Sequence, residues 1–360
     1  MNAMRVSLVT DAWAPQVNGV VTTLRHTLEV LRAMDVMVDV ITPEGHDTVA
    51  CPSYPEIRLV WGGAAEVRRR LAAFNPDAVH VATEGPLGWA ARRHCLDRGW
   101  RFTTSYHTRF PEYLRARWPV PEAWTYAWLR KFHGAAARTM VGTPRLRKEL
   151  SSRGFAGLAD WSRGVDTDLF RPGWFADGVD ESRHRAMRPR LIYVGRVAVE
   201  KNIAAFLSLP LDADKVVVGD GPARKRLESD HPEVRWTGFL HGEALVSMIA
   251  QADCLVFPSR TDTFGLVMLE AMACGVPVAA YPVTGTLDIV SPGLTGELHD
   301  ELHVAVMRAL RLDRIAVREA AMKHSWATST SQFLANLVPV VSRSATRMRG
   351  AVPRLLGESL

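Results

Sequence analysis

Two carboxylates in the C-terminal half of the sequence are spaced to bind a ligand with several hydroxyl groups. Asp262 and Glu270 lie in FPSRTDTFGLVMLEAMACGVPV with seven residues between them. We expect a helix to start near Phe264 and to stop at Gly275, so that Asp262 precedes the helix and Glu270 lies within about two turns of its start. One carboxylate can then accept sugar hydroxyls and the other ribose hydroxyls. The structural alternative makes Asp262 a helix cap and Glu270 a surface acid.

The start of the same helix offers a place for a phosphate between the two carboxylates. The amides of Phe264, Gly265 and Leu266 are expected to have no partner within the helix and to lie at the positive end of its dipole. The segment therefore predicts a site for a sugar, a phosphate and a ribose together.

A second segment, YVGRVAVEKN, supplies positive charge. The strand at residues 191–194 ends at Gly195, which places Arg196 and Lys201 just beyond the carboxyl edge of the predicted sheet. Ligands of doubly wound sheets bind at that edge. An arginine fork and a mobile lysine together can neutralise a diphosphate, whereas the structural alternative is two solvated loop cations.

A third segment, TDAWAPQVNGVVTTL, joins the first strand to the first helix. Asn18, Gly19 and Val20 stand at the expected helix N-terminus, where main-chain amides can receive a phosphate. The loop lacks the G-x-G-x-x-G pattern, and no acidic residue follows in the dinucleotide arrangement, so a nicotinamide enzyme is disfavoured. The alternative is that Gly19 only permits a turn.

The elements that position these residues form two series of alternating strands and helices. The first series starts at MRVSLVTD, and the second runs from RLIYVGR to VPVAAY. This alternation predicts parallel sheets covered by helices on both faces. A polar stretch near Pro172 to Pro189, punctuated by Gly and Pro, is the expected linker. We therefore predict two Rossmann-like doubly wound domains, residues 1–172 and 173–327, with the tail 328–360 packing back on the first.

Composition limits the classes of function. The chain has 360 residues, of which 47% are hydrophobic, which is enough for two cores, and it contains no apolar run long enough to span a membrane. The first strand follows the N-terminus almost directly, so we expect no signal peptide and a cytoplasmic location. The four cysteines have no metal-binding spacing. The net charge of +6 indicates an anionic partner: nucleic acid, an anionic membrane surface or a phosphorylated substrate.

The stretch from Arg109 to Lys131 interleaves basic and aromatic side chains. This combination is typical of a peripheral membrane face, and it also fits stacking platforms for single-stranded nucleic acid or a core with a solvated rim. Docking to an anionic membrane is the preferred interpretation, and nucleic acid is the least favoured. Between its two ends the stretch contains Arg115, Arg117 and Arg130 together with Phe110, Tyr113, Trp118, Trp124, Tyr126 and Trp128.

Taken together, these motifs resemble glycosyltransferase family 4, a large family of retaining enzymes with the GT-B fold. GR with a Lys five residues on, VVGDGP and PSRTDTFGLVMLEAMACGVPV are similar to the donor-binding half of that family. The segments TDAWAPQVNGVVTTL, SYHTRFPEY and SRGVDTDLFRP also fit, so the resemblance covers nearly the whole chain. The first acid of the family's E-x7-E motif is usually Glu and is Asp262 here. The TDTFG sequence resembles the branch of sulfoquinovosyl and mannosyl lipid transferases.

The resemblance implies a role for each candidate residue. Arg196 and Lys201 would hold the donor diphosphate, Glu270 the ribose and Asp262 the transferred sugar. Gly19 would approach the same diphosphate from the other side of the cleft between two facing domains.

His107, in RFTTSYHTRF, matches the family position that meets the sugar near the reacting carbon. It joins Asp262, Arg196 and Lys201 as a candidate catalytic residue. No protein nucleophile is evident, and the resemblance implies that the acceptor hydroxyl attacks on the face of the departing phosphate, which takes the proton. The anomeric configuration is then retained.

Asp166 and Asp168 match the D-x-D motif that chelates a divalent metal in the other glycosyltransferase fold, but the resemblance places them in a segment that lines the donor cleft. We therefore expect a metal-independent enzyme without a cofactor.

The predicted reaction moves a hexose from a UDP- or GDP-sugar to a membrane lipid, such as diacylglycerol or a phosphoinositide, at the inner face of the cell membrane. Transfer to a soluble saccharide is the alternative. A nucleotide-sugar epimerase and a non-catalytic sugar- or nucleic-acid-binding module are further alternatives.

Overall fold

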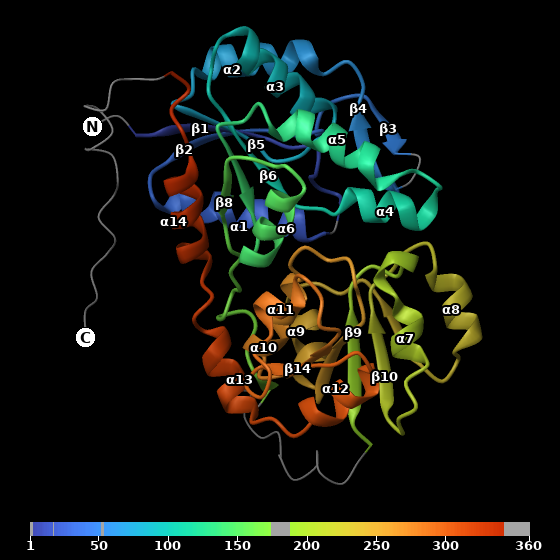
Figure 1. Ribbon diagram of the computed structural model, residues 1–360. Coiled ribbons are helices and arrows are strands. Elements are labelled where there is room, and N and C mark those ends of the chain that lie inside the picture. Colours follow the sequence, from blue (N-terminus) through green and yellow to red (C-terminus); the bar gives the residue numbers. More distant parts are fainter. Residues whose placement is uncertain (1–2, 17, 52–53, 174–187, 342–360) are drawn as a thin grey trace, which may run out of the picture.

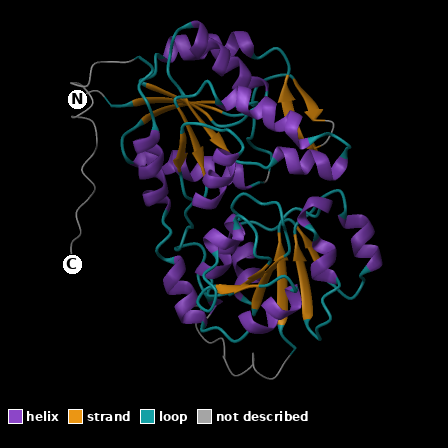
Figure 2. Cartoon of the chain, viewed as in Figure 1, coloured by secondary structure: helices purple, strands orange, loops and turns teal. Residues whose placement is uncertain are grey.

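A computed structural model describes residues 3–16, 18–51, 54–173 and 188–341 of the protein. These residues form two parallel six-stranded sheets with helices on both faces, one above the other in the view of Figures 1 and 2. The predicted fold class is therefore confirmed. Most of the linker expected near Pro172 to Pro189, and the end of the chain after residue 341, lie outside the described residues.

The upper sheet has the strand order β2-β1-β5-β6-β7-β8. Its strands are short and largely buried because helices cover both sides, and all of its paired strands run parallel. A separate antiparallel hairpin, β3 and β4, lies between β2 and β5 in the chain. The strands are β1 (Arg5–Val9), β2 (Met37–Ile41), β3 (Thr48–Cys51), β4 (Tyr54–Val60), β5 (Ala78–Val81), β6 (Thr103–Tyr106), β7 (Arg138–Val141) and β8 (Leu158–Asp160).

The lower sheet has the order β11-β10-β9-β12-β13-β14, again parallel throughout. In both sheets the chain changes direction across the sheet beside its first strand, between β1 and β5 above and between β9 and β12 below. Doubly wound sheets bind ligands at such switch points. The strands are β9 (Arg190–Val194), β10 (Asp214–Val218), β11 (Arg235–Gly238), β12 (Cys254–Phe257), β13 (Val278–Ala280) and β14 (Gly296–Leu298).

Helices connect the strands in each half. None of the described helices is both long enough and apolar enough to cross a bilayer. The upper half contains α1 (Gly19–Ala33), α2 (Ala64–Phe74), α3 (Pro86–Asp97), α4 (Phe110–Arg117), α5 (Glu122–His133) and α6 (Pro144–Ser152). The lower half contains η3 (Val199–Lys201), α7 (Ile203–Leu207), α8 (Arg224–Asp230), α9 (Gly242–Ala250), α10 (Leu266–Ala273), α11 (Thr286–Ile289), α12 (Leu302–Ala309) and α13 (Arg314–Ala321), and α14 (Trp326–Asn336) follows.

Helix α14 returns to the upper half, beside α1 (Figure 1). Its Phe333 is fully buried in one core with Trp161, the ring centroids lying 4.9 Å apart. The guanidinium of Arg138, at the start of β7, donates to the carbonyl of Ala335 at 3.0 Å. The last described helix therefore ties the end of the lower half to the sheet of the upper half.

Candidate active site

A cavity of about 1050 Å³ lies between the switch points of the two sheets. Every site residue predicted from the sequence lines it, although these residues come from widely separated parts of the chain. Their assembly in one cavity is the arrangement expected at facing carboxyl edges. The residues are Asn18, Gly19, Val20, His107, Arg196, Lys201, Asp262, Phe264, Gly265, Leu266 and Glu270.

Lys201 and Asp262 form an ion pair at the lower wall of the cavity. Burial opposes ionisation of Asp262, but the charge and hydrogen bond of Lys201, together with hydrogen bonds from Ser259 and Tyr113, lower the pKa of Asp262 below its ordinary value. Burial alone would lower the pKa of Lys201, and the Asp262 carboxylate raises it instead. Both groups are therefore charged at neutral pH. Asp262 Oδ2 is buried and has no hydrogen-bond partner among the described residues, so it is the oxygen left for a ligand.

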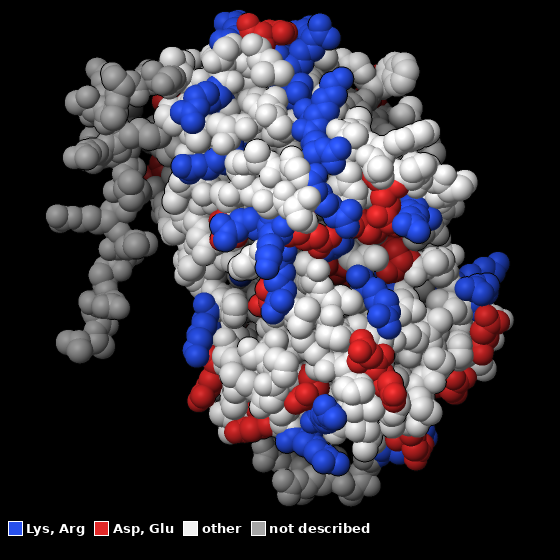
Figure 3. Space-filling view, in the orientation of Figure 1, with Lys and Arg blue, Asp and Glu red and all other residues white. Residues whose placement is uncertain are grey.

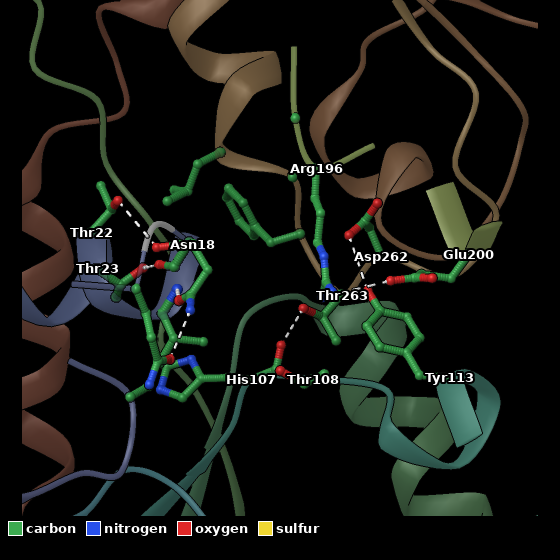
Figure 4. A pocket seen from close by; sticks show the side chains of 18 of the residues that line it. Asn18, Thr22, Thr23, His107, Thr108, Tyr113, Arg196, Glu200, Asp262 and Thr263 are labelled. Atoms are coloured by element: carbon green, nitrogen blue, oxygen red, sulfur yellow. Dashed lines mark hydrogen bonds and ion pairs between the residues drawn. The ribbon is translucent and has the colours of Figure 1, made fainter. Parts of the chain in front are cut away.

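Tyr113 reaches this pair from the upper half. Its hydroxyl donates to Asp262 Oδ1 at 3.4 Å, and its ring centroid lies 5.9 Å from Lys201 Nζ. Figure 4 shows Tyr113 facing Asp262 across the cavity. The sequence had placed Tyr113 only in the basic and aromatic stretch. Its position within SYHTRFPEY, shortly after the end of β6, could have indicated that Tyr113 also lies at the cavity.

Arg196 follows Gly195 directly after β9. The Tyr193 hydroxyl donates to the Arg196 carbonyl at 2.8 Å, and an Arg196 guanidinium nitrogen lies 4.0 Å from a carboxylate oxygen of the buried Glu200. The Arg196 side chain is 23% exposed, so it retains access to the cavity. Together Arg196 and Lys201 supply two cations within one loop, as the diphosphate site predicted from the sequence requires.

The start of α10 differs from the prediction. Gly265 has a φ of 88°, in the left-handed region, and the helix begins at Leu266 instead of Phe264. A Cβ at Gly265 would lie 2.9 Å from Met268 Cε and 2.9 Å from the Phe257 ring, so the bend requires glycine. The residues of the first turn that line the cavity are therefore Leu266 and Val267. The Phe264 amide lies before the start of the helix. Asp262 Oδ1 accepts from Tyr113 and Lys201, and Oδ2 has no partner among the described residues, so Asp262 does not cap α10 and the cap alternative was wrong.

Glu270 lies one turn into α10 and faces the cavity. Burial raises the pKa of its carboxyl group to about 7. Among the described residues, no hydrogen bond or ion pair to this carboxylate is found, in contrast to Asp262. A ligand hydroxyl would give the Glu270 carboxylate the hydrogen bond it lacks.

The first loop approaches α10 from the upper half. The Asn18 side chain caps α1, its Oδ1 accepting from the amides of Val20 and Val21 at 3.0 Å each. The Val20 amide is therefore already bonded, which corrects the expectation that it is free for a phosphate. A Cβ at Gly19 would lie 3.5 Å from Leu266 Cδ1, so Gly19 lies close to the start of α10.

His107 has both ring nitrogens engaged. Nδ1 faces the Arg163 guanidinium at 3.2 Å, and because a guanidinium only donates, Nδ1 accepts and Nε2 carries the proton toward Ser105 Oγ at 2.8 Å. Burial, and then the charge of Arg163, hold the pKa of His107 well below its ordinary value. The imidazole is thus neutral. Its backbone carbonyl accepts from Thr263 Oγ1 at 2.6 Å, which joins the two halves at the cavity (Figure 4).

Arg163 was not predicted as a site residue. It is 4% exposed and lines the cavity, with its guanidinium 4.4 Å from the Trp161 ring centroid. Burial lowers its pKa to about 9, so it stays protonated at neutral pH. The signal was available in SRGVDTDLFRP, where an arginine follows a strand end.

Asp166 and Asp168 lie in a local turn. Asp166 Oδ1 accepts from the amides of Asp168 and Leu169 at 3.1 and 3.0 Å, which makes the pair a local turn. No group of three or more metal-ligating side chains is found within the described ranges.

The basic and aromatic stretch divides into buried and exposed residues. Arg109 is 8% exposed and pairs with Glu112 and Glu149, and Tyr126 is 3% exposed, so neither belongs to an outer face. The side chain of Arg117 lies outside the described residues, and Arg130 is half-buried and donates to the Arg153 carbonyl. The residues left on the surface are Arg115, Trp118, Trp124, Trp128 and Lys131, with Trp124 72% exposed.

Comparison with known proteins assigns this architecture to a family. The model of "Glycosyltransferase Family 4" matches residues 17–169, and that of "Glycosyl transferases group 1" matches residues 188–311. A GDP-mannose-dependent alpha-mannosyltransferase of Mycolicibacterium smegmatis is 30% identical over 373 residues, which cover 96% of this chain and 100% of that protein. The chain belongs to glycosyltransferase family 4. It is a glycosyltransferase, as predicted.

Other relatives and solved structures agree. A sulfoquinovosyl transferase of Arabidopsis thaliana is 31% identical over 318 residues, covering 80% of this chain and 62% of that protein. Sucrose-phosphate synthase from Thermosynechococcus elongatus superposes with a TM-score of 0.71 at 20% identity, over 92% of this chain and 98% of that one. Anabaena HepE in complex with UDP and glucose superposes with a TM-score of 0.66 at 15% identity, over 92% of this chain and 98% of that one. These structural matches establish the GT-B fold.

Proposed function

We propose that this glycosyltransferase moves a hexose from a nucleotide diphosphate sugar to a membrane lipid acceptor with retention of anomeric configuration. The observation that carries the proposal is the asymmetry of the cavity. Its lower wall presents cations and the start of a helix beside two carboxylates, and its upper wall presents tryptophans. The first combination suits a phosphate-linked sugar and the second an apolar chain.

The donor is expected to lie on the lower wall. Arg196 and Lys201 would meet the diphosphate, Asp262 Oδ2 a hydroxyl of the sugar, and Glu270 the ribose. The relatives named above support a GDP- or UDP-linked donor, because one is named for GDP-mannose and the solved neighbour contains UDP. GDP-mannose is therefore the first donor to test, and UDP-glucose the second.

The acceptor is expected to enter past the tryptophans of the upper wall. Trp124 and Trp128 line the cavity and are also 72% and 43% exposed, so the cavity opening is continuous with the outer face of α5. Trp118, Arg115 and Lys131 extend that exposed face, and Figure 3 shows Lys and Arg side chains gathered on the upper half. Exposed tryptophans beside basic residues favour docking on an anionic membrane surface, from which a lipid headgroup can reach the cavity. We accordingly propose a peripheral protein of the inner membrane face.

The chemistry follows from the charges at the lower wall. The bond between the anomeric carbon and the leaving diphosphate oxygen breaks while the acceptor oxygen bonds to the same carbon from the same face. The acceptor proton passes to the leaving diphosphate. Arg196 and Lys201 stabilise the charge that develops on that diphosphate, which is the largest contribution a site of this type can make. The neutral His107 is held too firmly to take the proton and instead shapes the wall near the reacting carbon.

The test is incubation with labelled GDP-mannose or UDP-glucose and membrane lipid, followed by chromatography of the organic phase. We expect a labelled glycolipid whose new linkage is α. Labelled product confined to the aqueous phase with added saccharides would instead establish a soluble acceptor. An altered nucleotide sugar formed without any acceptor would establish an epimerase.

A further inference from the structure

Glu84 is a carboxylate on the acceptor side of the cavity that has no role in donor binding. It follows β5 at the upper switch point, is 7% exposed and lines the cavity. Its Oε1 accepts from His133 Nε2 at 3.0 Å, and no other hydrogen bond to Glu84 is found among the described residues. One carboxylate oxygen is therefore fixed, and the other is left to the cavity.

His133 holds Glu84 in a defined orientation. Its Nδ1 lies 2.9 Å from Thr104 Oγ1, which in turn lies 2.9 Å from Thr139 Oγ1. His133 is 2% exposed, and with both nitrogens bonded its ring cannot turn without loss of a buried hydrogen bond. The carboxylate is thus presented to the cavity by a chain of buried contacts through α5, β6 and β7.

Asp11, the neighbouring acid on the same wall, differs from Glu84. Its two carboxylate oxygens already accept from the amides of Leu87 and Gly88 and from the Thr83 hydroxyl, at 2.8, 3.2 and 3.0 Å. It caps the start of α3 and is 4% exposed. Glu84 is consequently the acid on this wall with capacity left for a ligand.

The surroundings of Glu84 are aromatic. His133 packs against Phe132, Phe132 against Trp89, and Trp89 against Trp128, with ring centroids 5.1, 5.1 and 5.8 Å apart. The described lysine and arginine side chains that line the cavity lie elsewhere, at the donor loop or beside His107: Arg163, Arg196 and Lys201.

We propose that Glu84 determines acceptor specificity by binding a hydroxyl of an uncharged headgroup and by repelling headgroups that carry a phosphate. This inference rests on the proposed function, because it concerns the acceptor of the same site. A buried carboxylate forms strong hydrogen bonds with hydroxyl donors, whereas a second anion beside it is unfavourable, because the cations that line the cavity lie at the donor loop or beside His107. Of the two lipid classes considered for this enzyme, the diacylglycerol type fits and the phosphoinositide type does not.

The test uses two probes with the same alkyl chain, n-octyl glucoside and n-octyl phosphate, both below their micelle concentrations. Binding is measured by calorimetry with GDP or UDP at saturation, so that octyl phosphate cannot occupy the donor diphosphate site. We expect wild type to bind octyl glucoside at least ~10-fold more tightly than octyl phosphate. In Glu84→Gln, octyl glucoside should bind ~10-fold more weakly and octyl phosphate more tightly, so that the preference disappears.

Glu66→Gln is the matched control, because Glu66 is partly exposed on α2, away from the cavity, and pairs with Arg69. Glu66→Gln should keep the wild-type preference.

If Glu84→Gln unfolds, Glu84→Asp is the second variant, because it keeps the charge and shortens the side chain. Glu84→Asp should bind octyl glucoside more weakly and still exclude octyl phosphate. An unchanged preference in the Glu84 variant, or wild-type binding of octyl phosphate as tight as that of octyl glucoside, would overturn the proposal. Because no turnover is required, a failure of lipid transfer in the organic-phase assay would be a separate result.

Discussion

The two halves of the protein share one architecture and differ in the side chains at their switch points. In the lower half, the residues after β9 and β12 are the cations Arg196 and Lys201 and the acid Asp262. In the upper half, the corresponding positions after β1 and β5 hold Asp11 and Glu84, with aromatic rings nearby. In the assignment proposed above, the same sheet edge binds a phosphate in one half and a neutral, partly apolar group in the other. Within this fold, binding chemistry is set by the loops and is independent of the sheet.

The acids that line the cavity also differ in how far they are satisfied without a ligand. Asp11 accepts three hydrogen bonds, and the Glu84 carboxylate is anchored through His133. In the lower half, Asp262 Oδ2 has no partner in the described part of the chain, and the pKa of Glu270 is raised by burial to about 7. Asp262 and Glu270 therefore keep capacity that a ligand can satisfy, which is typical of functional sites.

The largest expected effect is the loss of Lys201. Lys201→Ala removes a cation beside the donor diphosphate and leaves Asp262 without its partner, so kcat/KM should fall by about 30- to 1000-fold, equivalent to ~2 to 4 kcal/mol. Glu270→Ala should have a similar effect on transfer. The measurement is initial rate at subsaturating donor, with circular dichroism as the control for folding. Lys225→Ala, an exposed lysine on α8, is the matched variant and should retain wild-type activity. Near wild-type rates in both Lys201→Ala and Glu270→Ala would contradict the assignment of the donor site to the lower half.

The second effect sharpens the role of the upper half. Replacing Trp124 and Trp128 together with Ala should weaken binding to vesicles containing anionic lipid by roughly 10- to 100-fold, because both rings are exposed anchors. Affinity for GDP or UDP should not change. Ile315→Ala is the control, since Ile315 is 61% exposed on α13 of the lower half. Cosedimentation of the double variant equal to that of wild type would reject this face as the docking surface.

The difference between the halves was only partly predictable from the sequence. The parallel sheets followed from alternation because their short apolar strands are buried on both faces. That the candidate donor residues lie together was predictable because they share short segments, Arg196 with Lys201 and Asp262 with Glu270. The start of α10 was misplaced because the left-handed bend at Gly265 cannot be distinguished from an ordinary helical turn by pattern alone.

Residues whose roles depend on distant contacts were harder to predict. Arg109 was assigned to the surface, but its guanidinium is buried against Glu149, forty positions away. Glu84 was not singled out, since nothing in TEGPLG shows that His133 lies beside it. Such pairings arise from packing between elements, and local periodicity does not contain them.

A smaller effect is expected on the stability of the folded protein, where the Glu270 carboxylate is proposed to bind the donor but its burial is unfavourable. Its pKa is about 7 in the folded protein against 4.5 without burial, so the folded state binds the proton more tightly and ionisation costs stability. This cost appears as pH rises from about 4.5 and is complete above about pH 7. Glu270→Gln should therefore raise the free energy of unfolding by ~1 to 2 kcal/mol at pH 8.5, after allowance for partial exposure, with a higher Tm. At pH 5 the stabilisation should be much smaller, and transfer activity should fall at both pH values. Thermal unfolding at the two pH values checks the sign. Equal stabilisation at both would mean that charge at Glu270 is not the cause.

The smallest expected effect is that of chelation, which should be none. In the proposed reaction the negative charge on the leaving diphosphate is met by Arg196, Lys201 and the start of α10, and the acids nearby are already assigned, Asp262 to its lysine and Glu270 to a ribose. A divalent cation in the same place would be repelled by Lys201 and would compete with the sugar hydroxyl for Asp262 Oδ2. Initial rates with and without EDTA, on enzyme freed of trace metal, should therefore agree within error. Loss of activity that only manganese or magnesium restores would contradict this assignment of the lower half. It would favour a metal site at Asp166 and Asp168, whose turn would then have to open to bind the ion.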